Sequence, residues 1–221
     1  KNNDLIDNYF ITTSPDIIKT KINKNKIYYL PIPVDPNLEF EEFYNYKKTK
    51  DLFFGLSHGV NFGKLKKNTY DNREKFIDEL LKISSTFETN FEFNFLGLYN
   101  ELPKWNFDFN NEIKKSLTAL NLSRGGPNKY ASSNRIALLM GNGIVPFIHE
   151  DVKYQDFFDN DEIITYKNQI DLIDKLLKIK DKPDILKKRA IKSKKSYFNY
   201  FQNNIIADFI INKVFDRKQK F

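Results

Sequence analysis

The stretch TALNLSRGGPNKYASSNRIALLMGNGIVPFIHED, residues 118–151, decides the fold. It opens with a short, mostly apolar run at 119–122, passes through a polar, Gly-rich loop, and enters a helical pattern at 134–140. Gly141–Asn142–Gly143 stops that helix, and a second apolar run follows at 144–148. Strand, loop, helix, glycine stop and strand together predict a βαβ unit with two parallel strands.

The loop of this unit gathers cationic and hydroxyl side chains. Parallel sheets bind ligands at the carboxyl ends of their strands, so we expect the loop to lie at the ligand-binding edge. Free amides at a helix N-terminus attract anions, and arginine and lysine bind them. We therefore predict an anion site formed by Arg124, Gly125, Lys129, Ser132, Ser133, Asn134 and Arg135. Simple helix capping is the alternative role for the two serines and Asn134.

Strand and helix patterns alternate through most of the chain. Apolar runs and period-2 alternation predict strands, and a 3.6-residue period predicts helices. The expected order after residue 50 is strand 51–57, helix 72–87 capped by Asp71, strand 91–99 and helix 109–117; beyond the central stretch come helix 153–158, strand 162–167, helix 169–179 and a helical region at 184–215. Such alternation predicts an α/β domain with a parallel sheet flanked by helices.

The N-terminal part carries a smaller α/β pattern. We predict a strand at 7–13, a short helix at 15–22 that begins after Ser14, and a strand at 26–32. Three prolines between 31 and 36 cannot continue a central strand. Residues 37–50 show no clear period, and we interpret them as a linker between domains.

Composition narrows the possible functions. The chain has 221 residues and a net charge of +7. From residue 178 onward thirteen basic residues face four acidic ones, a balance of +9, which leaves −2 for the remainder. That tail could attract nucleic acid or anionic lipid, although a solvated helical face is the simpler interpretation.

Several classes of site and segment are excluded. The absence of cysteine rules out disulfides and thiolate metal sites, and two histidines are too few for a histidine-based metal cluster. No apolar run approaches the roughly 20 residues of a membrane span. The chain begins with Lys rather than Met, so we expect a fragment or a processed product.

Several segments resemble GT-B glycosyltransferases. DNYFITTSPDIIKTK and KIYYLPIPVDP resemble the end of the first Rossmann-like domain of that class, where a strand ends in a Val-Asp pair, here Val34–Asp35. DLFFGLSHGVNFG resembles the first strand and phosphate loop of the second domain. The central stretch resembles the donor-binding core of the "glycosyl transferases group 1" families, above all the branch with spore-maturation-type glycosyltransferase-like proteins. Asp71–Asn72–Arg73 is the nearest match to the Asp and Arg that precede the first long helix in that branch.

The resemblance implies a division into domains. Residues 1–36 would end the N-terminal Rossmann-like domain and 37–50 would be the linker. Residues 51–203 would form the C-terminal nucleotide-sugar-binding domain, and 204–221 the crossover helix. The acceptor-binding domain would be largely missing, and with it the general base. We therefore expect this part of the chain to be inactive alone, and we expect no cofactor and no metal.

The resemblance also implies further donor-binding residues. His58, Gly59 and Asn61 would follow the first strand of the second domain, Arg73 would begin its first helix, and Tyr99 would follow its second strand. Glu150 stands where the family often places an acid that meets the donor sugar. Tyr130 and Leu138 occupy the positions of two family glutamates eight residues apart, so donor binding would depend on Arg135, Lys129 and backbone amides instead.

Three hypotheses follow. The first is a glycosyltransferase that moves a sugar from a nucleotide-sugar donor to a glycan or glycoconjugate acceptor in polysaccharide biosynthesis, in the cytoplasm or at the inner face of the membrane through peripheral contact. The second is a non-catalytic nucleotide-sugar or carbohydrate-binding module. The third, a basic protein that binds nucleic acid or membrane through its tail, is the least favoured, and we expect no nucleic-acid partner.

Overall fold

A five-stranded parallel sheet forms the centre of the protein. The structure, a computed structural model, describes residues 6–56, 72–99 and 101–216. The strands are β3 (Lys50–Gly55), β4 (Phe93–Leu96), β5 (Ser116–Asn121), β6 (Val145–His149) and β7 (Ile164–Tyr166), and their order across the sheet is β4-β3-β5-β6-β7. All four pairings are parallel. The chain order reverses between β3 and β5, which makes that crevice the topological switch point of the sheet.

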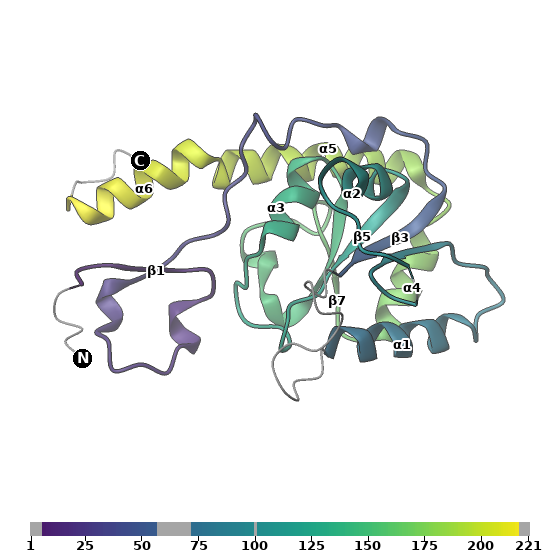
Figure 1. The fold of residues 1–221 in the computed structure, drawn as a ribbon, viewed down its shortest axis with the longest axis horizontal. Coiled ribbons are helices and arrows are strands. Elements are labelled where there is room, and N and C mark those ends of the chain that lie inside the picture. The colour runs from purple at the N-terminus through teal and green to yellow at the C-terminus, as the bar shows by residue number, and fades with distance from the viewer. Residues whose placement is uncertain (1–5, 57–71, 100, 217–221) are drawn as a thin grey trace.

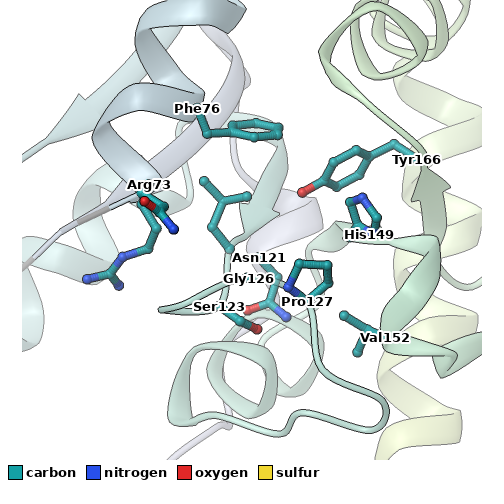
Figure 2. A pocket seen from close by; sticks show the side chains of 11 residues that line it. Arg73, Phe76, Asn121, Ser123, Gly126, Pro127, His149, Val152 and Tyr166 are labelled. Carbon is teal, nitrogen blue, oxygen red and sulfur yellow. The ribbon is translucent and has the colours of Figure 1, made fainter. Parts of the chain in front are cut away.

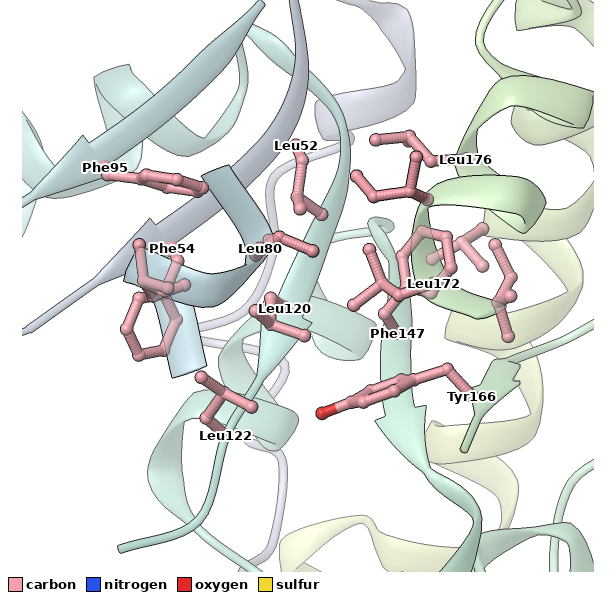
Figure 3. Packing of buried hydrophobic residues seen from close by; sticks show 14 of the residues in the cluster. Leu52, Phe54, Leu80, Phe95, Leu120, Leu122, Phe147, Tyr166, Leu172 and Leu176 are labelled. Carbon is pink, nitrogen blue, oxygen red and sulfur yellow. The ribbon is translucent and has the colours of Figure 1, made fainter. Parts of the chain in front are cut away.

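Helices cover both faces of this sheet (Figure 1). The helices α1 (Asn72–Ser84) and α4 (Gln169–Ile179) bury Ile77, Leu80 and Leu172 against one face, where the side chains of Leu52 and Phe54 point. Figure 3 shows this packing. The opposite face receives α2 (Asn106–Ile113) and α3 (Asn134–Gly141), which pack against Phe53 and its neighbours. Strands buried on both faces have continuous apolar runs, as β3 does.

A small second sheet lies apart from the first. Its two parallel strands are β1 (Tyr9–Ile11) and β2 (Ile27–Tyr29). The C-terminal helix α6 (Asn203–Val214) reaches this sheet, and Phe209 makes edge-to-face contacts with Phe10 and Tyr28 at 6.3 Å between ring centroids. In Figure 1 this helix and β1 lie together at one end of the molecule. The predicted fold class, an α/β fold with a parallel sheet flanked by helices, is confirmed.

Residues 37–50, the predicted linker, pack against the large domain. Phe43 in the 3-10 turn Phe43–Asn45 is fully buried in the core on the face of the sheet that α2 and α3 cover. Its amide donates to the carbonyl of Asn142 at 2.8 Å, and the Asn142 side-chain oxygen accepts from the Glu41 amide at 3.0 Å. Gly143 leaves room for the Tyr44 ring, because a Cβ there would lie 2.5 Å from it. The glycine stop of α3 is therefore the docking point of this connector.

Other boundaries also differ from prediction. The helix predicted at 15–22 is only the 3-10 turn Pro15–Ile17. Ile17, Ile18 and Ile22 are β-branched, and β-branching lowers helix propensity. The strand predicted at 91–99 ends at Leu96, where Gly97 turns with φ +73°. The helix predicted at 153–158 is a pair of 3-10 turns, Glu150–Val152 and Tyr154–Asp156, because Lys153 between them has φ +59°.

Two further predicted helical regions, 109–117 and 184–215, have other bounds in the structure. The helix predicted at 109–117 is α2, and β5 already begins at Ser116. The helical region predicted at 184–215 is two helices, α5 (Pro183–Phe201) and α6. They part at Gln202, where Val34 inserts: its amide donates to the Phe201 carbonyl and its carbonyl accepts from the Asn203 amide, both at 2.9 Å. The predicted helix α4 agrees with the observed bounds, and Asp71 lies outside the described residues.

Candidate functional site

A cavity opens at the carboxyl edge of the large sheet (Figure 2). Its volume is about 100 Å³, and it lies between the ends of β5, β6 and β7 and the first turn of α1. The lining residues are Asn72, Arg73, Phe76, Asn121, Leu122, Ser123, Gly126, Pro127, His149, Val152 and Tyr166. This is the edge at which open parallel sheets bind ligands.

The sheet register brings the polar lining residues together. Asn121 is the last residue of β5, His149 the last of β6 and Tyr166 the last of β7. Asn121 is paired with Ile148 across β5 and β6, and His149 with Tyr166 across β6 and β7. Parallel strands in this register end at the same level, so three polar side chains from distant parts of the chain reach one cavity.

His149 is held in one orientation. Its Nδ1 accepts the Asp151 amide hydrogen at 3.2 Å, and its ring meets Tyr166 edge to face at 5.4 Å between centroids. A neutral imidazole that accepts at Nδ1 carries its proton on Nε2. His149 can therefore offer an N–H donor at Nε2. Burial raises the pKa of Tyr166 well above its usual value, so its phenol stays protonated.

Arg135 lies at the topological switch point. Its guanidinium donates to the carbonyl of Leu122 at 2.9 Å and to the carbonyl of Gly55 at 3.0 Å, and it stacks 5.0 Å from the Phe54 ring centroid. Gly55 is the last residue of β3 and Leu122 directly follows β5, and the chain order reverses between these two strands. Arg135 ties the two strand ends together beside the cavity and does not line it.

Three predicted site residues contact the N-terminal segment. Lys129 pairs with Asp16 at 3.1 Å and its carbonyl accepts from the Ser14 amide. The Ser132 hydroxyl accepts from the Ile32 amide at 2.8 Å. Tyr130 donates to Asp156 at 2.7 Å and packs against Tyr29 and Phe157. This part of the loop is the contact between the large sheet and the small one.

The remaining predicted residues fall into two groups. Arg73 lines the cavity from the first turn of α1. Arg124, Gly125, Ser133, Asn134, Glu150 and Tyr99 do not line it. Ser133 precedes α3 but its side chain makes no capping hydrogen bond, so the predicted cap is not formed. Tyr99 donates from its hydroxyl to Asp78 of α1. His58, Gly59 and Asn61 lie outside the described residues.

Arg124, Lys129 and Arg135 do not line this cavity, and their joint anion site stays a prediction. Sequence reasoning passed over Asn121 and Tyr166, because both lie in runs that were interpreted as buried strands. The signal that could have found them is a polar side chain at the carboxyl end of an otherwise apolar strand.

The two positions of the family glutamates have other roles. Tyr130 makes the contacts described above, and Leu138 packs against the core beneath the sheet. Within residues 6–56, 72–99 and 101–216, no group of three or more His, Cys, Asp or Glu side chains is placed to hold a metal ion. In the same residues, no helix combines the length and apolar character that crossing a bilayer requires.

Comparison with known proteins identifies the fold. No protein-family model matches the sequence, and no curated protein does. Sucrose-phosphate synthase from Thermosynechococcus elongatus matches 95% of this chain at 8% identity with a TM-score of 0.59. The lipopolysaccharide outer core galactosyltransferase WaaB in its apo form matches 96% of the chain at 11% identity with a TM-score of 0.50. The chain spans 58% and 62% of their respective lengths. What the chain shares with both is the Rossmann-like α/β fold, a parallel sheet flanked by helices.

Proposed function

We propose that this chain is the nucleotide-sugar-binding part of a GT-B glycosyltransferase that transfers a sugar to a glycan or glycoconjugate acceptor. The observation that carries the proposal is the cavity at the carboxyl edge of the parallel sheet, bounded by the first turn of α1 and lined by Arg73 and His149. The fold likeness to two glycosyltransferases supports it. Their whole length exceeds this chain, so acceptor binding and the general base belong to the rest of the enzyme in this proposal.

Sugar transfer leaves negative charge on the departing nucleoside diphosphate. Cations and oriented N–H groups that surround this charge stabilise the transition state without a metal. In the proposal Arg73, in the first turn of α1, meets the diphosphate from the cavity wall that this turn forms. The His149 Nε2–H group donates to the donor, because Nδ1 is occupied by the Asp151 amide.

Arg135 acts as a positioning residue in this proposal. Its two bonds to strand-end carbonyls hold the β3 and β5 ends in register beside the cavity. A lysine cannot make two such divergent bonds from one planar group. Arg135 does not line the cavity, but we expect Arg135→Lys to weaken nucleotide binding. The ends of β3 and β5 beside the cavity would then be held less firmly.

A screen of thermal unfolding against UDP, GDP, ADP and CMP, and against their sugar conjugates, tests the proposal. A ligand at one hundred times its Kd adds about 2.7 kcal/mol to the free energy of unfolding. We expect one nucleoside diphosphate to raise the Tm clearly, and inorganic pyrophosphate to raise it less. If no nucleotide raises the Tm above the pyrophosphate control, nucleotide-sugar binding is excluded.

A second candidate function is a non-catalytic nucleotide-sugar or carbohydrate-binding module. The observation that favours it is the absence of carboxylates at Tyr130 and Leu138, whose side chains face aromatic and core partners. Both candidates give the same nucleotide stabilisation. They differ in the full-length protein, because only the transferase hydrolyses or transfers the donor sugar.

A further inference from the structure

Asn121 is buried at the cavity without a polar partner. Its exposed fraction is 3%, and its side chain is part of the cavity lining (Figure 2). Across the described parts of the chain, no side chain or backbone group bonds to its carboxamide. The carboxamide opens onto the cavity, where it is available to a ligand. An amide in this position at the ligand-binding edge indicates a role in ligand recognition.

The rest of the cavity is mostly apolar. Phe76, Leu122, Pro127 and Val152 supply hydrocarbon surface around the carboxamide. The volume of about 100 Å³ is well below the roughly 300–1,000 Å³ of sites that hold a whole small ligand. The cavity therefore suits one flat ring with apolar faces and a single polar edge.

We propose that this cavity takes the base of the nucleotide, a single-ring pyrimidine, and that Asn121 reads its hydrogen-bonding edge. This inference rests on the proposed function. A carboxamide presents an acceptor and a donor side by side. The uracil edge presents N3–H beside the C4 carbonyl, so the two pairs are complementary. The apolar walls formed by Phe76, Leu122 and Val152 suit the faces of a flat ring better than a sugar, which carries hydroxyls on most of its carbons.

The arrangement also orients the rest of the nucleotide. Arg73 and the first turn of α1 form one wall of the cavity, and His149 and Tyr166 form another. With the base against Asn121, the ribose and phosphates extend past Arg73 towards the open side. The carboxamide thus sets base specificity while the cation at the mouth contributes affinity for any nucleotide.

Calorimetric titration of the 221-residue chain with base analogues tests the inference. The ligands are UDP, its 3-deaza analogue, in which C–H replaces N3–H and the C4 carbonyl becomes a hydroxyl, and its N3-methyl analogue. Loss of one buried hydrogen bond should weaken binding of both analogues about tenfold to a hundredfold. CDP, which inverts the donor and acceptor at this edge, is accommodated after an amide flip and serves as the pyrimidine comparison.

The variant Asn121→Leu supplies the matched control. We expect it to bind UDP and the 3-deaza analogue with the same affinity, because the group that distinguishes them is gone. Its unfolding free energy, measured in urea, shows whether it folds. If it does not, the analogue series on the unaltered chain still decides the question.

The outcomes separate the inference from the proposed function. Equal affinity of the unaltered chain for UDP and its 3-deaza analogue overturns the inference and leaves nucleotide binding intact. Stronger binding of purine than of pyrimidine diphosphates overturns it too. Failure of every nucleoside diphosphate to bind overturns the proposed function, and the inference with it.

Discussion

Two buried asparagines at opposite edges of the sheet have opposite surroundings. Asn142 follows α3 and is 1% exposed; its side chain donates to the Leu138 carbonyl at 3.0 Å and accepts from the Glu41 amide at 3.0 Å. Asn121 ends β5 and is 3% exposed, with no such partner among the described residues. The satisfied amide belongs to the junction where segment 34–44 docks on the Gly141–Gly143 stop. The unsatisfied amide belongs to the cavity.

The difference separates structure from function within one domain. A buried polar group that has its partners contributes to stability, whereas one that opens onto a cavity without a protein partner is available to a ligand. Substitutions at the junction should therefore lower the free energy of unfolding. Substitutions at the cavity should change binding and leave the fold nearly as stable as before.

Gly143→Ala should have the largest effect on stability. Gly143 has φ +77°, and an added Cβ would lie 2.5 Å from the Tyr44 ring. We expect a loss of about 2–4 kcal/mol, because left-handed backbone strain and overpacking act together. Urea unfolding measures it.

Gly125→Ala is the matched control for that change. Gly125 has nearly the same φ, +78°, but nothing lies within 4 Å of the added Cβ. Only the backbone strain remains, about 1–2 kcal/mol. Equal losses in the two variants would show that segment 34–44 does not dock on the stop in solution.

The two asparagines themselves give the next largest contrast. Asn142→Leu leaves the Glu41 amide without its acceptor, and we expect a loss of about 1–3 kcal/mol in the free energy of unfolding. Asn121→Leu removes an amide that has no partner to lose, so its free energy of unfolding should stay within about 0.5 kcal/mol of the parent. Urea unfolding of both variants checks this. A loss at Asn121 as large as that at Asn142 would mean that its carboxamide is structural.

The pH dependence of the free energy of unfolding tests how Lys48 is held at the junction. Its ammonium donates to the carbonyls of Phe43 and Lys114 at 2.7 and 3.0 Å, and burial lowers its pKa to about 8. Between pH 8 and the unfolded pKa near 10.4, the unfolded chain keeps a proton that the folded chain has released. The free energy of unfolding should therefore rise with pH in this window, by about 1 kcal/mol between pH 8 and pH 9.

The variant Lys48→Met isolates that contribution from the other titrating groups. The stability difference between parent and variant should move in favour of the parent as the pH rises from 8 to 9. A flat difference would show that the two carbonyl bonds hold the ammonium charged despite its burial.

The contrast also explains what the sequence could predict. The helices α3 and α4 and the strand β6 were predicted close to their observed bounds, because their signals are local: an apolar period, a glycine stop and flanking polar residues. The docking of Phe43 was missed, since it depends on the Asn142 carbonyl and on Leu139 and Ile144, all about a hundred residues away. No local pattern in residues 37–50 carries that information.

The site was harder to predict for the same reason. Lys129 and Ser132 have the residue types of an anion site, yet Asp16 and the Ile32 amide occupy them, and both partners come from the distant N-terminal segment. Asn121 lies inside an apolar run, and only the register of three strands reveals that it meets His149 and Tyr166. Residue type predicted the chemistry, and topology decided which residues reach the cavity.

Arg73→Ala should have the smallest effect and completes the comparison. Arg73 is half-buried at the mouth of the cavity, where water screens its charge, so we expect nucleoside diphosphate affinity to fall by a factor of about two to five. The loss should be similar for every base and should shrink as ionic strength rises, because a screened charge loses its reach. Calorimetric titration at two salt concentrations measures it, and Lys82→Ala in the last turn of the same helix is the control. A loss that depends on the base and not on salt would move base recognition from Asn121 to Arg73, and the buried amide would then have no ligand to account for it.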